Sequence, residues 1–182
     1  MESAGDDPEQ TAAPTPLAEE RTLLVIKVRP ARQLDAHLDK IMQAIRLYGG
    51  AAEVTDGDDI IVTFERTDQL TKATCTALLI ATLMARARGN ISVKSGMHAC
   101  ANDRDDAETE QARKHATHLA SIADGEVLAS RRIFSESMEN EQVNFEGFHS
   151  SLTPDGEVYV LASLNEASRN LIEKQADQLQ LV

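Results

Sequence analysis

The fold of this chain is decided by the stretch Ala51-Ala52-Glu53-Val54-Thr55-Asp56-Gly57-Asp58-Asp59-Ile60-Ile61-Val62-Thr63-Phe64. It predicts a strand, a tight turn and a second strand. The pair Asp56-Gly57 predicts a two-residue hairpin turn, because both residue types adopt positive φ at low cost. The run Ile60-Ile61-Val62 is β-branched, as is typical of a mostly buried strand.

The tip of this hairpin is acidic. Three of its carboxylates belong to Asp56, Asp58 and Asp59, and Glu53 adds a fourth nearby. Carboxylates held on rigid strands suit a divalent cation, although the spacing is not that of an EF-hand loop. A solvated acidic turn is the alternative, and it is the commoner use of such residues.

Composition narrows the function classes. The chain has 182 residues, of which 42% are hydrophobic and 3% aromatic, so we expect one domain with an aliphatic core plus a tail. A net charge of −12 argues against a nucleic-acid or anionic-membrane surface. No apolar run has membrane-spanning length and no signal peptide is visible, and the two cysteines Cys75 and Cys100 suit a reducing compartment. These features predict a cytoplasmic location, either of the whole protein or of the cytoplasmic part of a larger or membrane-attached one.

Three segments are expected. Residues 1–20 carry three prolines, six acidic side chains and few large apolar ones, which predicts a disordered acidic tail or linker. Residues 21–163 form the predicted domain. Residues 164–182 end the chain in a polar amphipathic helix.

The order of elements predicts the fold class. Strands are expected at 22–29, 51–64 (the hairpin), 91–98, 126–129, 142–147 and 157–161, and helices at 31–48, 68–88, 107–123, around 131–137 and 165–180. The first strand is apolar on consecutive positions and is therefore expected to be central. This β-α-β-β-α-β-α-β order, followed by a strand pair, predicts an α+β sandwich with helices on one face of a largely antiparallel sheet.

Four motifs in this order resemble the catalytic domain of class III adenylate/guanylate cyclases. They lie in Tyr48-Gly49-Gly50 with the hairpin after it, in Lys94–Cys100, in Leu119–Ser130 and in Glu157–Leu161. The first is similar to the family's Gly-Gly, Gly-Asp and apolar strand ending in Phe, and the second to its Arg-x-Gly-Ile-His-x-Gly strand. The resemblance covers residues 22–162 and implies a ferredoxin-like βαββαβ core, nucleotide cyclase-like.

The resemblance also implies where a cyclase site would lie. The family holds two metal ions with two aspartates, and these ions activate the ribose hydroxyl and clamp the triphosphate. The first aspartate is replaced here by Lys27, whose ammonium opposes cation binding, whereas the second matches Asp58. The adenine-reading lysine corresponds to Val54.

The family's Asn and Arg, which orient the ribose and stabilise the phosphate charge, correspond to Lys114 and His118. The family builds its site across a dimer, and this chain departs from the pattern on both sides. We therefore expect no catalytic residues, no metal ligand set and no cofactor, with Mg or Mn relevant only to residual nucleotide binding. Lys27, Asp58, Lys114 and His118 remain as a candidate remnant of the nucleotide cleft.

The expected function is that of a catalytically inactive cyclase-like domain that dimerises, regulates or scaffolds in bacterial signalling, as a homodimer or with a protein partner. Two alternatives stay open. One is a sensor that binds nucleotide without turnover, and the other is a divergent active adenylate/guanylate cyclase.

Other residues have competing interpretations. His115 and His118, three positions apart on a helix, could ligate a metal, but no third ligand is evident. Lys94, Arg113 and Lys114 either line an anion-binding cleft or pair with the abundant carboxylates. A buried small hydrophobe is expected at Cys75, a structural histidine at His98, and either an inert or a redox-exposed thiol at Cys100.

Overall fold

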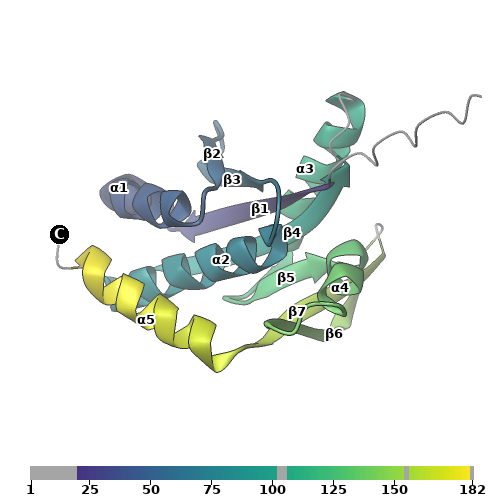
Figure 1. The fold of residues 1–182 in the computed structure, drawn as a ribbon. Helices are drawn as coiled ribbons and strands as arrows, with labels where there is room; N and C mark the ends of the chain where they lie inside the picture. The colour runs from purple at the N-terminus through teal and green to yellow at the C-terminus, as the bar shows by residue number, and fades with distance from the viewer. Residues whose placement is uncertain (1–19, 102–105, 154–155, 181–182) are drawn as a thin grey trace, which may run out of the picture.

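A computed structural model describes residues 20–101, 106–153 and 156–180. The strands are β1 (Glu20–Arg29), β2 (Ala51–Val54), β3 (Asp59–Phe64), β4 (Ser92–Ala101), β5 (Val127–Ser130), β6 (Val143–Thr153) and β7 (Gly156–Leu164). The helices are α1 (Arg32–Leu47), α2 (Gln69–Arg86), α3 (Asp106–Ile122), α4 (Arg131–Ser137) and α5 (Glu166–Gln180). Figure 1 shows these elements gathered around one sheet. None of the described helices is both long enough and apolar enough to cross a bilayer.

The described strands form one sheet in the order β2-β3-β1-β4-β5-β7-β6. Only the β4–β5 pair is parallel, and every other neighbouring pair is antiparallel. The predicted largely antiparallel α+β sandwich with a ferredoxin-like core is thus confirmed. Strand β1 lies in the middle of the sheet between β3 and β4, as its continuous apolar run predicts.

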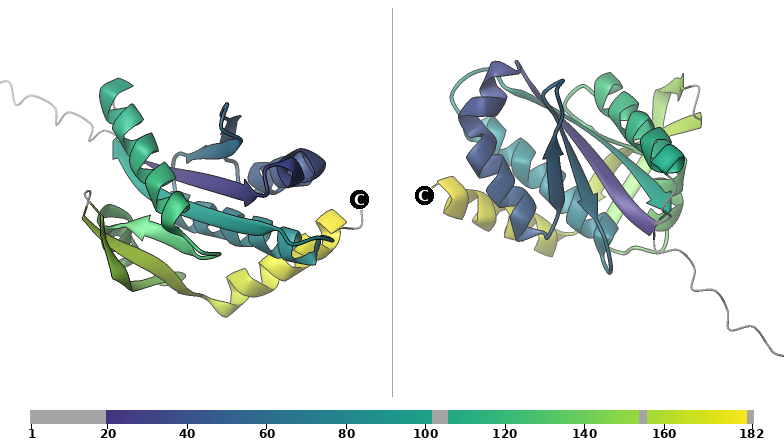
Figure 2. Two further views of the ribbon diagram at one scale, coloured as in Figure 1. Left: turned by 180° about the vertical axis from the view of Figure 1, so that it is seen from behind. Right: turned by 90° about the horizontal axis from the view of Figure 1, so that it is seen from above.

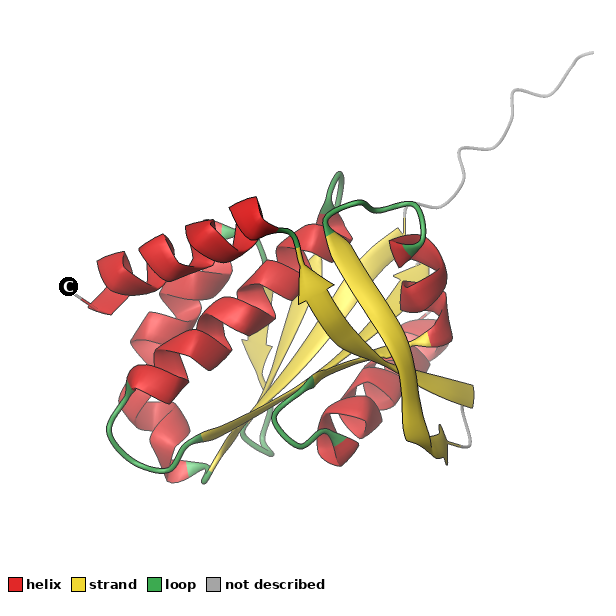
Figure 3. Cartoon of the chain, turned by 90° about the horizontal axis from the view of Figure 1, so that it is seen from below, coloured by secondary structure: helices red, strands yellow, loops and turns green. Residues whose placement is uncertain are grey.

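The helices cover both faces of the sheet, so the expectation of helices on one face is wrong for α3. Alternate residues of a strand point to opposite faces. On β1, Leu24 and Ile26 join the large core that also includes residues of α1, α2 and α5. Leu23 and Val25 pack instead in a second cluster with the alanines of α3. The right panel of Figure 2 shows α3 over one face of the sheet, and Figure 3 shows α2 and α5 over the other.

Helix α3 approaches the sheet closely because β4 has a glycine beneath it. A Cβ atom on Gly96 would lie 2.3 Å from the carbonyl oxygen of Ala116 and 2.5 Å from the backbone nitrogen of Ala120. Ala116 and Ala120 are themselves fully buried. Small side chains on both elements therefore set the height of α3 above the sheet.

The hairpin differs from the prediction in its loop. Strand β2 ends at Val54 and β3 begins at Asp59, and the backbone N–H of Thr55 donates to the carbonyl of Asp59 at 2.8 Å. The loop between these paired residues is Asp56-Gly57-Asp58, and the positive φ, 60°, falls on Asp58. The prediction of a two-residue turn is thus wrong. The loop has three residues, and the last of them is in the left-handed region, which is a common hairpin arrangement. The run Ile60-Ile61-Val62 is buried, as predicted.

Helix α5 packs onto α2 and α1. Its Ile172, Ala176 and Leu179 belong to the large core, and the hydroxyl of Tyr48, just after α1, donates to Gln175. Burial raises the pKa of Tyr48 to about 12. The helix is therefore part of the same core as the sheet. The division of the chain at residues 20 and 163 stays a prediction, and residues 1–19 lie outside the described residues.

A charged cluster lies where β1 begins. The guanidinium of Arg132 on α4 donates to the carboxylate of Glu20, and Glu136, one turn further along α4, lies beside Glu20 as well. Burial and the adjacent Glu20 raise the pKa of Glu136 to about 8, and the hydrogen bond with Glu136 lowers the pKa of Glu20. At neutral pH, Glu136 thus holds a proton that it donates to Glu20.

This cluster predicts a pH-dependent contribution to stability. Between the ordinary glutamate pKa of 4.5 and about 8, the folded chain keeps a proton on Glu136 that the unfolded chain has released. The free energy of unfolding therefore falls as pH rises through that window. In thermal melts from pH 5 to pH 9, we expect Glu136→Gln to lose this decline and to gain about 1 kcal/mol over wild type at pH 9, after allowance for partial exposure. Parallel pH profiles for wild type and variant would contradict the shared proton.

Candidate functional site

Three charged side chains at the base of the hairpin, those of Lys27, Arg29 and Asp59, form one ion-paired cluster. Lys27 lies directly opposite Asp59 in the β1–β3 ladder. The ammonium of Lys27 donates to one carboxylate oxygen of Asp59 at 2.9 Å, and the guanidinium of Arg29 donates to the other at 2.9 Å. The side chains of Lys27 and Asp59 are only 14% and 13% exposed. Both oxygens of Asp59 are thus engaged by cations of the chain itself.

The same row of the sheet continues to β4. Lys94 is the cross-strand partner of Lys27 on that side. Directly opposite residues point to the same face of a sheet, so two ammonium-bearing side chains stand side by side there. Asp59 is the one carboxylate that the structure pairs with Lys27 and Arg29 in the described residues. This row of Asp59, Lys27 and Lys94 repels a metal cation more than it attracts one.

Asp58 has a different setting from Asp59, although the two are adjacent. It is exposed at the end of the hairpin loop, with the positive φ already noted. Its neighbour Asp59 starts β3, and the backbone N–H of Asp59 is within 3.2 Å of the hydroxyl of Thr55. The structure therefore turns Asp59 toward Lys27 and leaves Asp58 in the loop.

Lys114 and His118 lie together on α3. They line a cavity of about 450 Å³ with Thr55 and Ile61 from the hairpin and Ser121 from the last turn of the helix. Lys27 and Asp58 are outside that lining. Of the four candidate cleft residues, the structure thus brings the two helix residues to one cavity and places the other two elsewhere.

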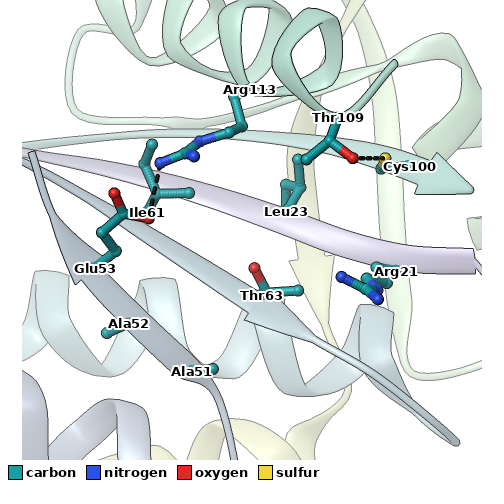
Figure 4. Close-up of a pocket in the computed structure, with 10 residues that line it drawn as sticks. All are labelled: Arg21, Leu23, Ala51, Ala52, Glu53, Ile61, Thr63, Cys100, Thr109 and Arg113. Carbon is teal, nitrogen blue, oxygen red and sulfur yellow. Dashed lines mark hydrogen bonds and ion pairs between the residues drawn. The ribbon is translucent and has the colours of Figure 1, made fainter. Parts of the chain in front are cut away.

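A second cavity, of about 290 Å³, lies beside the first under the N-terminal half of α3 (Figure 4). Its wall on the helix side is Arg113, whose guanidinium donates to Glu53 of β2 at 2.8 Å. Arg113 thus pairs with a carboxylate and lines a cavity as well, so the structure combines the two interpretations. On the far side lie Arg21 and Thr63, which no motif in the sequence singles out.

Cys100 belongs to this second cavity. Cys100 is only 3% exposed, so the alternative of a redox-exposed thiol is wrong. Its sulfur atom lies 3.9 Å from the hydroxyl oxygen of Thr109. Cys75, in contrast, is buried in the large core as predicted, and burial raises its pKa to about 11.

His115 and His118, the predicted pair on α3, have different surroundings. His98 on β4 hydrogen-bonds through Nδ1 to the hydroxyl of Ser130 at 2.7 Å, and its ring packs on that of His115 at 4.4 Å between centroids. His118 lies in the first cavity instead. Within residues 20–101, 106–153 and 156–180, no group of three or more His, Cys, Asp or Glu side chains could hold a metal ion.

Comparison with known proteins identifies the fold. No protein-family model and no curated protein matches the sequence. Among solved structures, a double mutant of the guanylyl cyclase domain of the RhoGC fusion protein from the aquatic fungus Blastocladiella emersonii matches with a TM-score of 0.64 and 11% identity, over 81% of this chain and 97% of that one. The adenylyl cyclase CyaB from P. aeruginosa matches with a TM-score of 0.59 and 13% identity, over 81% and 96%. An adenylate cyclase from Trypanosoma brucei matches with a TM-score of 0.61 and 15% identity, over 86% and 95%.

The chain has the fold of a class III cyclase catalytic domain. The sequence motifs that suggested this fold are thereby supported by a backbone match over 81–86% of the chain. At these identities the likeness concerns the fold alone, and the chemistry depends on the residues of this chain.

The residues of this cyclase fold do not fit a pair of metal ions. Two carboxylates a few ångströms apart are needed for such a pair. The position that the resemblance gives to the first carboxylate holds Lys27, whose ammonium lies 2.9 Å from Asp59. At the position that the resemblance gives to a metal-binding carboxylate, this chain therefore has a cation of its own.

Proposed function

We propose that this chain is a cyclase-fold domain without cyclase catalysis, and that it serves as a regulatory, dimerisation or scaffolding module in bacterial cytoplasmic signalling. The observation that carries the proposal is the ion-pair triad of Lys27, Asp59 and Arg29. In this triad the charge of the Asp59 carboxylate is neutralised by Lys27 and Arg29, so no metal ion is needed to balance it. A chain with this triad can lack two-metal chemistry and still keep the fold, because the ion pairs themselves join neighbouring strands of the sheet.

The remaining positions support the same proposal. Val54 stands at the position of the base-reading lysine, and Lys114 and His118 stand at those of the Asn and Arg. Removal of the groups that stabilise the transition state removes the rate enhancement, since only interactions stronger in the transition state accelerate a reaction. The negative net charge of −12 favours a protein partner over nucleic acid or an anionic membrane.

The proposed dimerisation surface is the hairpin at Val54–Ile60 with the adjacent face of the sheet. Val54 is 43% exposed on the edge strand β2, and such edges pair readily with other chains. One of the structural neighbours is a dimeric guanylyl cyclase domain, whereas others are monomeric, so this fold is compatible with both oligomeric states.

Sedimentation velocity tests the association. We expect a concentration-dependent dimer with a dissociation constant of about 10–100 µM, and we expect Val54→Glu to weaken it about tenfold or more. Leu171→Glu is the matched control, because Leu171 is equally exposed at 48% but lies on α5, over the other face. A chain that stays monomeric at high concentration, or an equal effect of both substitutions, would sink the dimerisation surface.

The second candidate is a nucleotide sensor without turnover, and the cavity at Lys114 and His118 favours it. Its volume of about 450 Å³ lies within the range of small-molecule sites, and Lys114 gives it a cation. Calorimetric titration with ATP and GTP, each with Mg²⁺ and with Mn²⁺, separates the two. Saturable heat would favour the sensor, whereas no heat in any combination supports the interaction module.

A further inference from the structure

The cavity under the N-terminal half of α3 has the character of a ligand site. Arg113 and Arg21 line it with two guanidinium groups, and each pairs with a glutamate: Arg113 with Glu53 at 2.8 Å and Arg21 with Glu65 at 3.1 Å. In Figure 4 the side chain of Arg113 descends from α3, and Arg21 approaches from the other end. Because the side chains of Glu53 and Glu65 are 62% and 51% exposed, a ligand carboxylate can take their place on the two arginines.

The rest of the lining suits the hydrocarbon part of an organic ligand better than a bare inorganic ion. Leu23 and Ile61 form an apolar floor on β1 and β3, and Thr63 and Thr109 add hydroxyl groups at the sides. Small-molecule sites have this combination of apolar walls and a few convergent polar groups. The volume of about 290 Å³ is at the lower end of such sites and suits a small molecule.

In the ion pair between Arg113 and Glu53, a ligand carboxylate can replace the Glu53 carboxylate. The side chain of Arg113 is 29% exposed, whereas that of Glu53 is 62% exposed. The hydrogen bond that the structure gives Arg113 uses Nη2 alone, so this is not the bidentate pair that guanidinium groups form best. An exposed pair of this kind is weak, and another carboxylate can displace Glu53 from Arg113.

We propose that this cavity binds a small organic carboxylate, whose carboxylate group pairs with Arg113 and whose carbon chain lies over Leu23 and Ile61. A short dicarboxylate binds Arg21 with its second group and displaces Glu65 from it. The site shares Arg113 and Ile61 with the cavity of Lys114 and His118, but it uses neither Lys27 nor Asp58, so the inference does not depend on the absence of catalysis.

Amide chemical-shift titration of the ¹⁵N-labelled chain tests the site, with butyrate, succinate, glutarate and inorganic phosphate as probes at constant ionic strength. We expect saturable shifts at Ala51–Glu53 and around Thr109, with dissociation constants of about 0.1–1 mM for the best dicarboxylate and weaker binding of butyrate. Phosphate is expected to bind at least about tenfold more weakly, because it cannot use the apolar floor.

Three variants define the site. Arg113→Gln is expected to weaken binding about tenfold or more, and Glu53→Gln to strengthen it severalfold, because the competing carboxylate is gone. Lys114→Gln is the matched control: it removes one positive charge from the next position of the same helix, outside this cavity, and is expected to change affinity less than about twofold.

Several results would overturn the proposal. They are the absence of saturable shifts with every carboxylate, equal binding of phosphate, equal losses in Arg113→Gln and Lys114→Gln, or no gain in Glu53→Gln. Because Glu53 is exposed, Glu53→Gln keeps the test valid even if Arg113→Gln disturbs the fold. Cyclic nucleotide production by the chain would refute the proposed function and leave this site untouched.

Discussion

Replacement of Asp59 by Asn is expected to lower the free energy of unfolding by about 3 kcal/mol, because it leaves two buried or half-buried cations without their counter-charge. Lys27 and Arg29 both depend on this carboxylate, and Lys94 stands directly opposite Lys27. Asn keeps the shape of Asp but loses the charge and one acceptor. Urea denaturation at neutral pH, with the slope compared between variants, measures the change.

Asp58→Asn is the matched control for this prediction. Asp58 is the adjacent residue, carries the same charge and is exposed in the loop. Asn tolerates a φ of 60° at least as well as Asp, so the change should stay within about 0.5 kcal/mol. Equal effects at the two positions would mean that Asp59 is not held by its two cations and is free to ligate a metal ion.

Replacement of Gly96 by Ala is expected to lower the free energy of unfolding by about 3 kcal/mol, at the upper end of overpacking effects. The added Cβ would meet backbone atoms of Ala116 and Ala120 at 2.3 and 2.5 Å, and a helix backbone has no rotamer with which to move away. Helix α3 would have to shift as a whole. Both cavities would then change shape, because Arg113 and Lys114 are on that helix.

Gly147→Ala on β6 is the control for Gly96→Ala. Nothing lies within 4 Å of a Cβ at Gly147, so the expected change is within about 0.5 kcal/mol of wild type. Thermal and urea denaturation of the two variants give the comparison. If Gly96→Ala were as stable as Gly147→Ala, then α3 would not be packed as closely on β4 as the structure has it.

The order of helices and strands could be predicted from the sequence because the local patterns agree with the fold. The apolar run of β1 and the β-branched run of β3 are strong local signals, and the structure gives both strands a neighbour on each side in the sheet. The face chosen by α3 could not be predicted, since a stripe of alanines packs equally well on either side. The decisive feature was the glycine on β4, whose meaning depends on the helix above it.

The candidate site was harder to predict because it depends on strand register. With a two-residue turn, Thr55 would pair with Asp58, but the three-residue loop pairs Thr55 with Asp59. A shift of one residue moves every side chain of a strand to the other face. The loop length is therefore the reason that Asp59, rather than Asp58, reaches Lys27. Arg21 and Thr63 were missed because they come from strands far apart in the sequence and belong to no motif.

The most direct test of the central claim is an assay for cyclic nucleotide production by the purified full chain, with ATP and with GTP, in Mg²⁺ and in Mn²⁺. An active adenylyl cyclase domain run alongside shows that the assay works. We expect no product above the protein-free control, for wild type and for Lys27→Asp alike, because restoration of one carboxylate leaves the base-reading, ribose and phosphate positions unfilled. Metal-dependent product from the wild-type chain, lost in Asp58→Asn, would contradict the account and identify the chain as a divergent cyclase.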